Sequence, residues 1–544
     1  MQYSSPEKKY NNSGIFAGLI LVSVSFLILA LALRGNWGAP NSTELNTIEW
    51  KDNGPLELSP ERGRFALTYS IVEDNSVKFS LPVARLATPD LGYINGDYVS
   101  LFAPGVSYII TPGYVLGRAL GASQVGAYAV VALFALFNVV LIRGISLKLG
   151  ASNSASLLAG LTFIAATPAF AYGVSLYQHH ISTFCILLAI YALLKWDNYK
   201  SLLLVWFLCT LSVSIDYPNF FMMLPIGIFA VGRIVKAKVV RESLHVNIKY
   251  LYILTFVSAI LPVMFFFWFN QASYNNPLQF AGTVPSAWDI DAEGKPRLPE
   301  TAVIGKDEDV FLLPEEQDKK VSNFFATRYL LNGFYLHFVS PDRGMLHFTP
   351  VMLLGFVGAF VFYKKNPRLC GLFLAILFSN ILLYSMWGDP WGGWAFGSRY
   401  LVPTYAILSV FIAVLLTRFN KNFIVLILFL ATFGYSSFVN TAGAITSNTN
   451  PPQVEVLALE KLSGRVQKYT YARNLDILNA NESKSFVFRT FANKYMSAWD
   501  YFKIIYGLVM LTVSITWLVE VFNNYISLSF KDKKLIWKVK GKNA

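Results

Sequence analysis

Residues 14–33 read GIFAGLILVSVSFLILALAL, a run without a charged side chain. A helix needs about 20 mostly apolar residues to cross the hydrocarbon core of a bilayer. Only a structure that satisfies its own backbone hydrogen bonds is stable there, so this run predicts a spanning helix. Similar runs recur and predict an all-α polytopic membrane protein with about 12 spans, in a range of roughly 11 to 13: Gly14–Leu33, Gln124–Ile142, Ala155–Leu176, Ile181–Leu194, Leu202–Ile215, Phe220–Val235, Tyr250–Phe269, Met345–Phe362, Leu369–Trp387, Tyr400–Leu416, Phe423–Val439 and Ile504–Phe522.

The composition supports a membrane protein. The 544 residues are 54% hydrophobic and only 14% charged, whereas soluble domains average about 25% charged residues. This excludes ordinary soluble enzymes and nucleic-acid binders, although the formal net charge is +13. The three cysteines, Cys185, Cys209 and Cys370, lie inside apolar runs and therefore indicate no disulfide framework.

Two segments leave alternatives open. Lys8 and Lys9 precede the first run, and residues 30–32 (Ala-Leu-Ala) resemble a cleavage site, so the first span could instead be a signal peptide. Its apolar stretch is long for that role. The segment Pro104–Gly121 is apolar, but its prolines and glycines disfavour a spanning helix. We expect this segment to be re-entrant or interfacial.

Basic residues mark one side of the membrane. With the N-terminus in the cytoplasm, the cytoplasmic tails and connectors hold 22 Lys and Arg residues, while the short connectors near 174–180, 216–219 and 388–398 hold none. This asymmetry follows the positive-inside rule and places both termini in the cytoplasm. It also explains the net charge of +13. The basic tail after residue 530 is read as a stop-transfer flank, with lipid binding as the alternative.

The same topology divides the chain. Residues 1–440 form the expected transmembrane catalytic module, with a first extracytoplasmic loop at 35–103 and an extracytoplasmic flap at 271–344. Residues 441–503 form a third outer segment, either a small cap or a long connector. Residues 504–544 supply the last span and a basic cytoplasmic tail. Since the cytoplasmic connectors are mostly too short to fold, the chemistry is expected outside the cytoplasm.

One carboxylate stands at the start of a predicted helix in the first loop. The stretch from Glu61 to Val72 follows Pro60, and its apolar residues recur at about helical spacing. A carboxylate near a helix N-terminus is stabilised in its ionised form. Glu61 is therefore either a simple capping charge or a catalytic group.

Four motifs resemble those of one enzyme superfamily. Residues 61–66 have the pattern Glu-x-x-Arg-Phe-Ala, and residues 96–105 read GDYVSLFAPG. Residues 340–344 read SPDRG, and residues 387–401 read WGDPWGGWAFGSRYL. In this order they resemble the GT-C glycosyltransferases, polytopic enzymes that use polyprenyl-phosphate sugars, and among them protein O-mannosyltransferases and the lipid A aminoarabinose transferase. The likeness covers roughly residues 14–440. Glu61 replaces the usual Asp, and no Trp-Trp-Asp oligosaccharyltransferase motif is present.

The resemblance implies transfer of a sugar to an acceptor, which requires three kinds of group. A carboxylate must take the acceptor's proton, and Glu61 is the candidate general base. A cation must stabilise the departing phosphate. Arginine suits this role because its planar guanidinium binds two oxygens at once. Arg399, beside Tyr400, is the first candidate, followed by Arg64 and Arg343; the alternative for Arg399 is an interfacial anchor.

Other polar and aromatic residues on the same side are candidates for binding sugar or acceptor. The tryptophans of the 387–401 motif offer flat faces to a sugar, with an aromatic belt as the alternative. The adjacent histidines, together with an acidic residue, could hold a divalent metal, although hydrogen bonding to substrate is the preferred role. The sequence identifies no certain cofactor, and a divalent metal stays the open alternative. The full set is Asp97, Tyr98, His179, His180, Asp216, Trp387, Asp389, Trp391 and Trp394.

The predicted function is thus a membrane glycosyltransferase of a prokaryotic plasma membrane with an extracytoplasmic active site. Its expected partners are a polyprenyl-phosphate sugar, membrane lipids, and a glycan, lipid or protein acceptor, with no nucleic acid. The alternative is a transporter or flippase of lipid-linked sugars. Transporters usually show internal repeats and ionisable residues at mid-membrane. The sequence shows no clear repeat.

Overall fold

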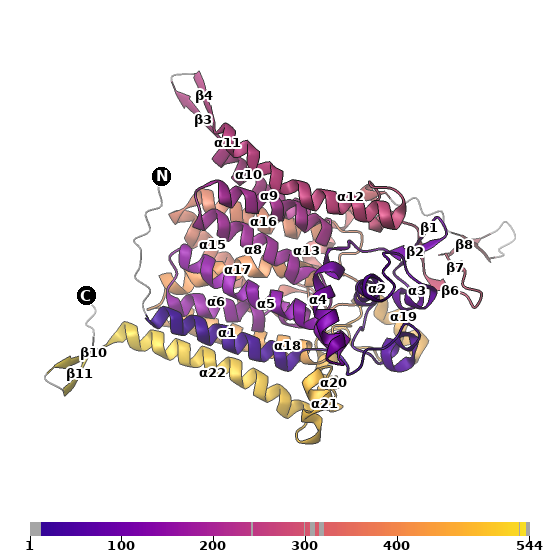
Figure 1. Ribbon diagram of the computed structural model, residues 1–544. Helices are drawn as coiled ribbons and strands as arrows, with labels where there is room; N and C mark the ends of the chain where they lie inside the picture. The colour runs from indigo at the N-terminus through magenta and orange to yellow at the C-terminus, as the bar shows by residue number, and fades with distance from the viewer. Residues whose placement is uncertain are drawn as a thin grey trace.

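A bundle of long helices forms the body of the protein (Figure 1). The computed structural model describes residues 12–240, 243–298, 300–304, 310–314, 320–531 and 534–539. Its α-helices are α1 Asn12–Ala32, α2 Ser59–Glu73, α3 Leu81–Ala87, α4 Gly105–Ala119, α5 Ser123–Lys148, α6 Asn153–Ala165, α7 Ala169–Gly173, α8 His179–Lys195, α9 Tyr199–Ile215, α10 Asn219–Ile234, α11 Tyr250–Ile253, α12 Ile260–Tyr274, α13 Leu330–Phe338, α14 Met345–Phe348, α15 Leu353–Lys365, α16 Pro367–Ser385, α17 Val402–Arg418, α18 Phe423–Ile445, α19 Gln453–Ser463, α20 Ala472–Asn479, α21 Phe486–Thr490 and α22 Ala498–Tyr525.

Seven helical segments among the described residues are long and apolar enough to cross a membrane, which indicates an integral membrane protein. Four shorter apolar helices, α6, α8, α9 and α10, accompany them. Helices lie over each of the twelve ranges expected from the sequence. The count of twelve spans stays a prediction, because length and composition support only the seven.

Prolines interrupt two of the expected spans. The expected helix over 155–176 is two helices, α6 and α7, because Pro168 has no N–H to continue the first helix and instead precedes the second. The expected span over 345–362 begins as the short helix α14. Pro350 then opens a 3₁₀ turn, η7 (Pro350–Met352), before α15 begins. The prediction of one unbroken helix in each range was therefore wrong.

The segment expected to be re-entrant or interfacial forms α4, a helix of 15 residues with Pro112 inside it. It runs across the ends of the long helices (Figure 1). Glycines allow it to pack closely on α5: a Cβ atom at Gly113 would lie 2.4 Å from the carbonyl oxygen of Gly126, and one at Gly126 would lie 2.0 Å from that of Gly113. The two backbones are in direct contact.

The predicted helix after Pro60 is confirmed as α2. The loops of the three outer segments gather at one end of the bundle, whereas both ends of the described chain lie at the other (Figure 1). The strands are short. They are β1 Leu91–Ile94, β2 Asp97–Ser100, β3 Val235–Val240, β4 Ser243–Ile248, β5 Ser286–Ala287, β6 Asp289–Ile290, β7 Pro296–Arg297, β8 Glu300–Ile304, β9 Val310–Pro314, β10 Ile526–Lys531 and β11 Lys534–Val539.

A small antiparallel sheet joins the first loop to the flap. β1 pairs with β2 on one side and with β5, from the flap, on the other. Asn95 and Gly96 turn the chain between β1 and β2 with positive φ angles of 54° and 87°, as a tight hairpin requires. The acidic clusters at 307–309 and 315–316 lie outside the described residues.

The close contact between α4 and α5 predicts a strong effect of one methyl group. Gly126→Ala should destabilise the protein by about 1–3 kcal/mol, because the new Cβ has no room. Thermal unfolding in detergent would measure the loss. Gly507→Ala in α22 is the matched control, since a Cβ there meets nothing within 4 Å. Equal unfolding temperatures for the two variants would contradict the predicted contact.

Candidate functional site

A cavity of about 460 Å³ opens where the first loop, the flap and the bundle meet. It brings together five residues that the sequence analysis named and that lie far apart in the chain. Its wall also includes polar and aromatic residues that the sequence analysis did not name. The polar and aromatic wall residues are Arg64, Phe102, Tyr177, Gln178, Asp216, Tyr217, Phe220, Phe221, Phe280, Phe324, Phe325, Tyr384, Trp387, Arg399 and Tyr400.

A chain of hydrogen bonds crosses one wall of this cavity. Arg64 Nη2 donates to Gln178 Oε1 at 2.7 Å, and Gln178 Nε2 donates to Asp216 Oδ2 at 3.1 Å. The Tyr384 hydroxyl donates to the same carboxylate oxygen at 3.4 Å. Burial raises the pKa of Asp216, and Arg64 opposes that rise. The chain thus holds one cation and one carboxylate side by side at the cavity.

Arg399 presents unused hydrogen-bond donors. Its guanidinium carbon lies 4.7 Å from the ring centroid of Tyr177 and 5.4 Å from that of Tyr400. Among the described residues, its Nε and Nη1 atoms have no hydrogen-bond partner. Gly392 adopts a φ of +73°, and a Cβ there would lie 3.0 Å from the Arg399 Nε atom. An arginine held by aromatic rings with free N–H groups is suited to bind an anion.

Aromatic side chains form much of the cavity wall, next to the charged groups. Tyr384 stacks on Tyr400 with ring centroids 4.2 Å apart and an interplanar angle of 6°. Trp387 stacks on Phe324, from the flap, at 5.4 Å. The flap also bonds to this loop through its backbone, since Gly388 N donates to the Phe324 carbonyl. The cavity therefore offers flat faces of the kind that hold a sugar ring.

Glu61 lies next to the cavity and is fully buried. Its Oε1 accepts a hydrogen bond from Leu176 N at 3.0 Å. Its Oε2 has no partner among the described residues. Pro60 and Arg64, on the same helix as Glu61, line the cavity. Tyr177, the neighbour of Leu176, also lines it. Glu61 itself is not part of the cavity wall.

Burial governs the protonation of Glu61. Loss of hydration raises its pKa from 4.5 to about 7, while Arg34 lowers it and Glu57 raises it further. A carboxyl group with a pKa near neutrality exchanges a proton readily at physiological pH. This is the property expected of a general base or acid.

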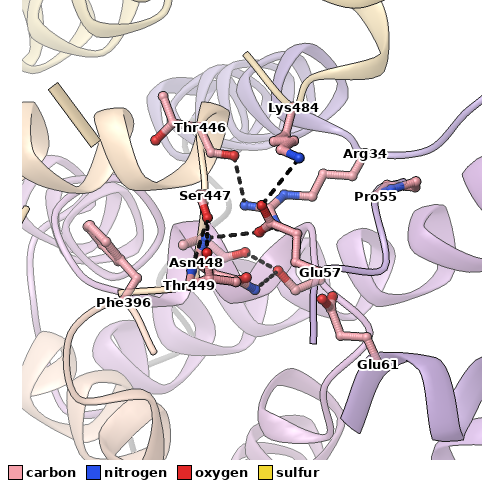
Figure 2. Close-up of polar contacts among 12 residues, drawn as sticks. Arg34, Pro55, Glu57, Glu61, Phe396, Thr446, Ser447, Asn448, Thr449 and Lys484 are labelled. Carbon is pink, nitrogen blue, oxygen red and sulfur yellow. Dashed lines mark hydrogen bonds and ion pairs between the residues drawn. The ribbon is translucent and has the colours of Figure 1, made fainter. Parts of the chain in front are cut away.

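A buried ion pair lies beside Glu61 (Figure 2). Arg34 Nη1 lies 2.8 Å from Glu57 Oε2, and Lys484 Nζ lies 3.7 Å from Glu57 Oε1. Asn448 N also donates to Glu57 Oε2 at 3.1 Å. These contacts join the end of α1, the first loop and the 441–503 segment.

Arg343 does not line the cavity, and its side chain is only 1% exposed. Its guanidinium donates to the carbonyl oxygens of Trp391, Gly393 and Asn450 and to its own neighbour Asp342. It thereby holds the 387–399 loop against the 441–503 segment. This arrangement leaves it outside the cavity wall.

Five further candidates have other partners in the structure. Asp97 forms an ion pair with Lys78 at 2.6 Å, and the Tyr98 hydroxyl donates to the Gly294 carbonyl. Asp389 Oδ2 accepts from Gly393 N within its own loop, and Trp394 Nε1 donates to Glu455. The Trp391 ring contacts that of Tyr329. None of the five lines the cavity.

The two histidines diverge. His179 stacks on Tyr177 with centroids 5.6 Å apart, whereas His180 contacts the Ala169 carbonyl through Nε2 and Asn138 through Nδ1. No group of three His, Cys, Asp or Glu side chains within the described ranges is placed to hold a metal ion. The open alternative of a divalent metal therefore has no ligand set in this part of the chain.

Several site residues could not be singled out from the sequence. Gln178 bridges Arg64 and Asp216, but a glutamine beside two histidines carries no signal of its own. Tyr384 precedes Trp387 by three residues, which could have linked it to the tryptophan motif. Arg34 and Glu57 were hidden among the charges at the end of the first span and in an acidic loop.

No protein family model and no curated protein sequence matches the chain. Among solved structures, the chain is similar to the apo oligosaccharyltransferase of Archaeoglobus fulgidus, with 13% identity and a TM-score of 0.49 over 84% of this chain and 59% of that one. It is also similar to apo ArnT from Cupriavidus metallidurans, with 12% identity and a TM-score of 0.44 over 92% of this chain and 76% of ArnT. The chain thus spans about three fifths of the length of the first of these proteins.

The raised pKa of Glu61 predicts a pH-dependent stability. Between pH 4.5 and about 7 the folded protein holds a proton that the unfolded chain releases. The contribution of Glu61 is therefore fully present below pH 4.5 and is lost as the pH rises to about 7. Relative to Glu61→Gln, the wild type should lose about 2–3 kcal/mol between pH 5 and pH 8. Thermal unfolding of both proteins in detergent checks this, and a constant difference across that range would contradict it.

Proposed function

We propose that this protein is a membrane glycosyltransferase that moves a sugar from a polyprenyl-phosphate donor to an acceptor. The observation that carries the proposal is that a cavity with charged side chains lies next to an apolar groove. The cavity holds Arg399 with free N–H groups beside Arg64 and Asp216, and a groove with an almost entirely apolar wall adjoins it. A molecule with a charged head and a long hydrocarbon tail fits such a pair.

The groove has a volume of about 730 Å³ and lies between α10 and α16. Its wall is almost entirely hydrocarbon. Phe221 and Phe325 line both the groove and the cavity, so the two spaces are adjacent at these rings. In the proposed complex the isoprenoid chain occupies the groove, and the phosphate meets Arg399.

The proposed reaction is a substitution at the anomeric carbon of the sugar. The acceptor oxygen or nitrogen attacks this carbon as the bond to the phosphate oxygen breaks, and polyprenyl phosphate leaves with the bonding electrons. Arg399 and Arg64 stabilise the charge on the departing phosphate. The stacked rings of Tyr384, Tyr400 and Trp387 hold the sugar.

Glu61 is proposed as the general base that takes the acceptor's proton. Its position beside Leu176, next to the cavity-lining Tyr177, places it at the edge of the site. Only its ionised form accepts a proton, so activity should rise with pH through about 7. Asp216 is proposed to hydrogen-bond the sugar or the acceptor from the cavity wall.

The remaining features of the proposal come from the sequence. They are an extracytoplasmic site, cytoplasmic termini, about twelve spans in a prokaryotic plasma membrane, and an acceptor that is a glycan, lipid or protein. The domain division at residues 440 and 503 belongs to the same proposal. A flippase of lipid-linked sugars is the competing function, because it could use the same apolar groove to carry the lipid.

Release of polyprenyl phosphate separates these functions. Purified wild type, given a labelled polyprenyl-phosphate sugar and a cell-envelope acceptor fraction, should release the lipid phosphate. Glu61→Gln should reduce this release by about 10²–10⁴-fold, because the base is lost. Arg399→Gln should also reduce release, since it removes the cation that meets the phosphate.

The matched control is Glu73→Gln. Glu73 lies at the other end of α2, where it pairs with Arg118 at 3.0 Å and receives the Tyr114 hydroxyl. This variant should keep wild-type release. Movement of the intact lipid-sugar across vesicle membranes without any release would overturn the transferase and support the flippase.

A further inference from the structure

The surroundings of Glu61 contain one ion pair that the proposed reaction does not use. Arg34 has no exposed surface, although it carries a full charge. Its Nη1 donates to Glu57 at 2.8 Å, and its Nη2 donates to the Thr446 carbonyl at 3.4 Å. A buried charge of this kind is stable only when its partners compensate the lost hydration. The position of Arg34 is therefore fixed by its contacts with Glu57 and with the Thr446 carbonyl.

Both halves of this pair bind the 441–503 segment. Arg34 reaches Thr446, while Glu57 receives Asn448 N and lies 3.7 Å from Lys484 Nζ (Figure 2). Glu57 precedes Glu61 by four residues, at the entry to α2. The 446–448 backbone thus contacts the cation and the anion at once, and the same pair fixes the start of the helix that carries Glu61.

Glu61 has no ion-pair partner within 4 Å among the described residues, so charges further away act on it. The charged and titratable groups around it come from several elements. Charges act over longer distances in a buried site than in water, because the local dielectric is low. The groups are Arg34 after α1, Glu57 before α2, Arg62 and Arg64 on α2, Tyr128 on α5, Tyr172 on α7 and Tyr177 before α8.

We propose that the Arg34–Glu57 ion pair is a positioning pair that sets the charge of Glu61, and that through it the 441–503 segment controls the proposed catalytic carboxylate. This rests on the proposed function. Arg34 favours the ionised form of Glu61 and Glu57 disfavours it, so the balance depends on how the two are held. Displacement of residues 446–448, for example by an acceptor that binds the outer segment, would free both partners and change that balance.

Two substitutions that break the same ion pair distinguish this role from a structural one. Glu57→Gln removes a negative charge, so the pH at which Glu61 is half protonated should fall by at least about half a pH unit. Arg34→Met removes a positive charge and should move that pH upward. Arg34→Lys keeps the charge and should stay near wild type. If the ion pair had only a structural role, Glu57→Gln and Arg34→Met would change the titration of Glu61 in the same way.

Two readouts follow the titration. The first is the pH dependence of polyprenyl phosphate release. The second is the infrared band of a protonated buried carboxyl group, assigned to Glu61 by its absence in Glu61→Gln. Glu73→Gln, which breaks the Glu73–Arg118 ion pair at the far end of α2, is the control and should shift neither.

The outcomes separate the two proposals. Opposite shifts of the infrared band in Glu57→Gln and Arg34→Met support the positioning role, even if no release occurs and the proposed transferase is refuted. Unshifted titration, or shifts in one direction, overturns the positioning role, whereas release of polyprenyl phosphate by the wild type still establishes the transferase. If Arg34→Met does not fold, the comparison of Glu57→Gln with Glu73→Gln decides, because the new amide at residue 57 still accepts hydrogen bonds.

Discussion

Every backbone N–H and carbonyl group in a hydrocarbon layer has to find its partner inside the protein, and the rest of this structure depends on that constraint. It makes the body of the chain a bundle of apolar helices and leaves little place there for charge. Charged and hydrogen-bonding side chains are consequently concentrated where the helices end. Three such groups lie at the end that carries the long loops. They are the cavity residues, the Arg34–Glu57 pair, and Arg343 with the carbonyl oxygens that it contacts.

This end of the bundle is organised by arginines in contrasting environments. Arg34 and Arg343 are buried and their charges are compensated by oxygen atoms of the protein. They connect segments that are distant in sequence. Arg399 instead rests on aromatic rings and keeps donors free beside the cavity. Arginine thus connects segments of the chain in two places and offers free hydrogen-bond donors to the cavity in a third.

The sequence predicted the parts of the structure that local rules determine. The apolar runs and the helix that begins near Glu61 follow from hydropathy and periodicity. Breaks at Pro168 and Pro350 could have been anticipated from the missing N–H group, but hydropathy alone extended the helices across them.

The site was only partly accessible by the same reasoning. Arg64, Asp216, Trp387, Arg399 and Tyr400 were named beforehand and meet at the cavity. The sequence placed Arg399 ahead of Arg64 and Arg343, but only tertiary contacts show that the donors of Arg343 are occupied. Gln178 and Glu57 were missed for the same reason, since each has one partner more than a hundred residues away in the chain, Arg64 for Gln178 and Asn448 for Glu57.

The groove between α10 and α16 has a further consequence for how ligands arrive. Leu224 and Ile228, two of its wall residues, are 46% and 64% exposed on the flank of the bundle, where the surrounding medium is lipid. Under the proposed function, the lipid donor would dissolve in the bilayer and enter this groove sideways. The quantity that governs its occupancy is its mole fraction in the membrane, and its supply is limited by lateral diffusion in two dimensions.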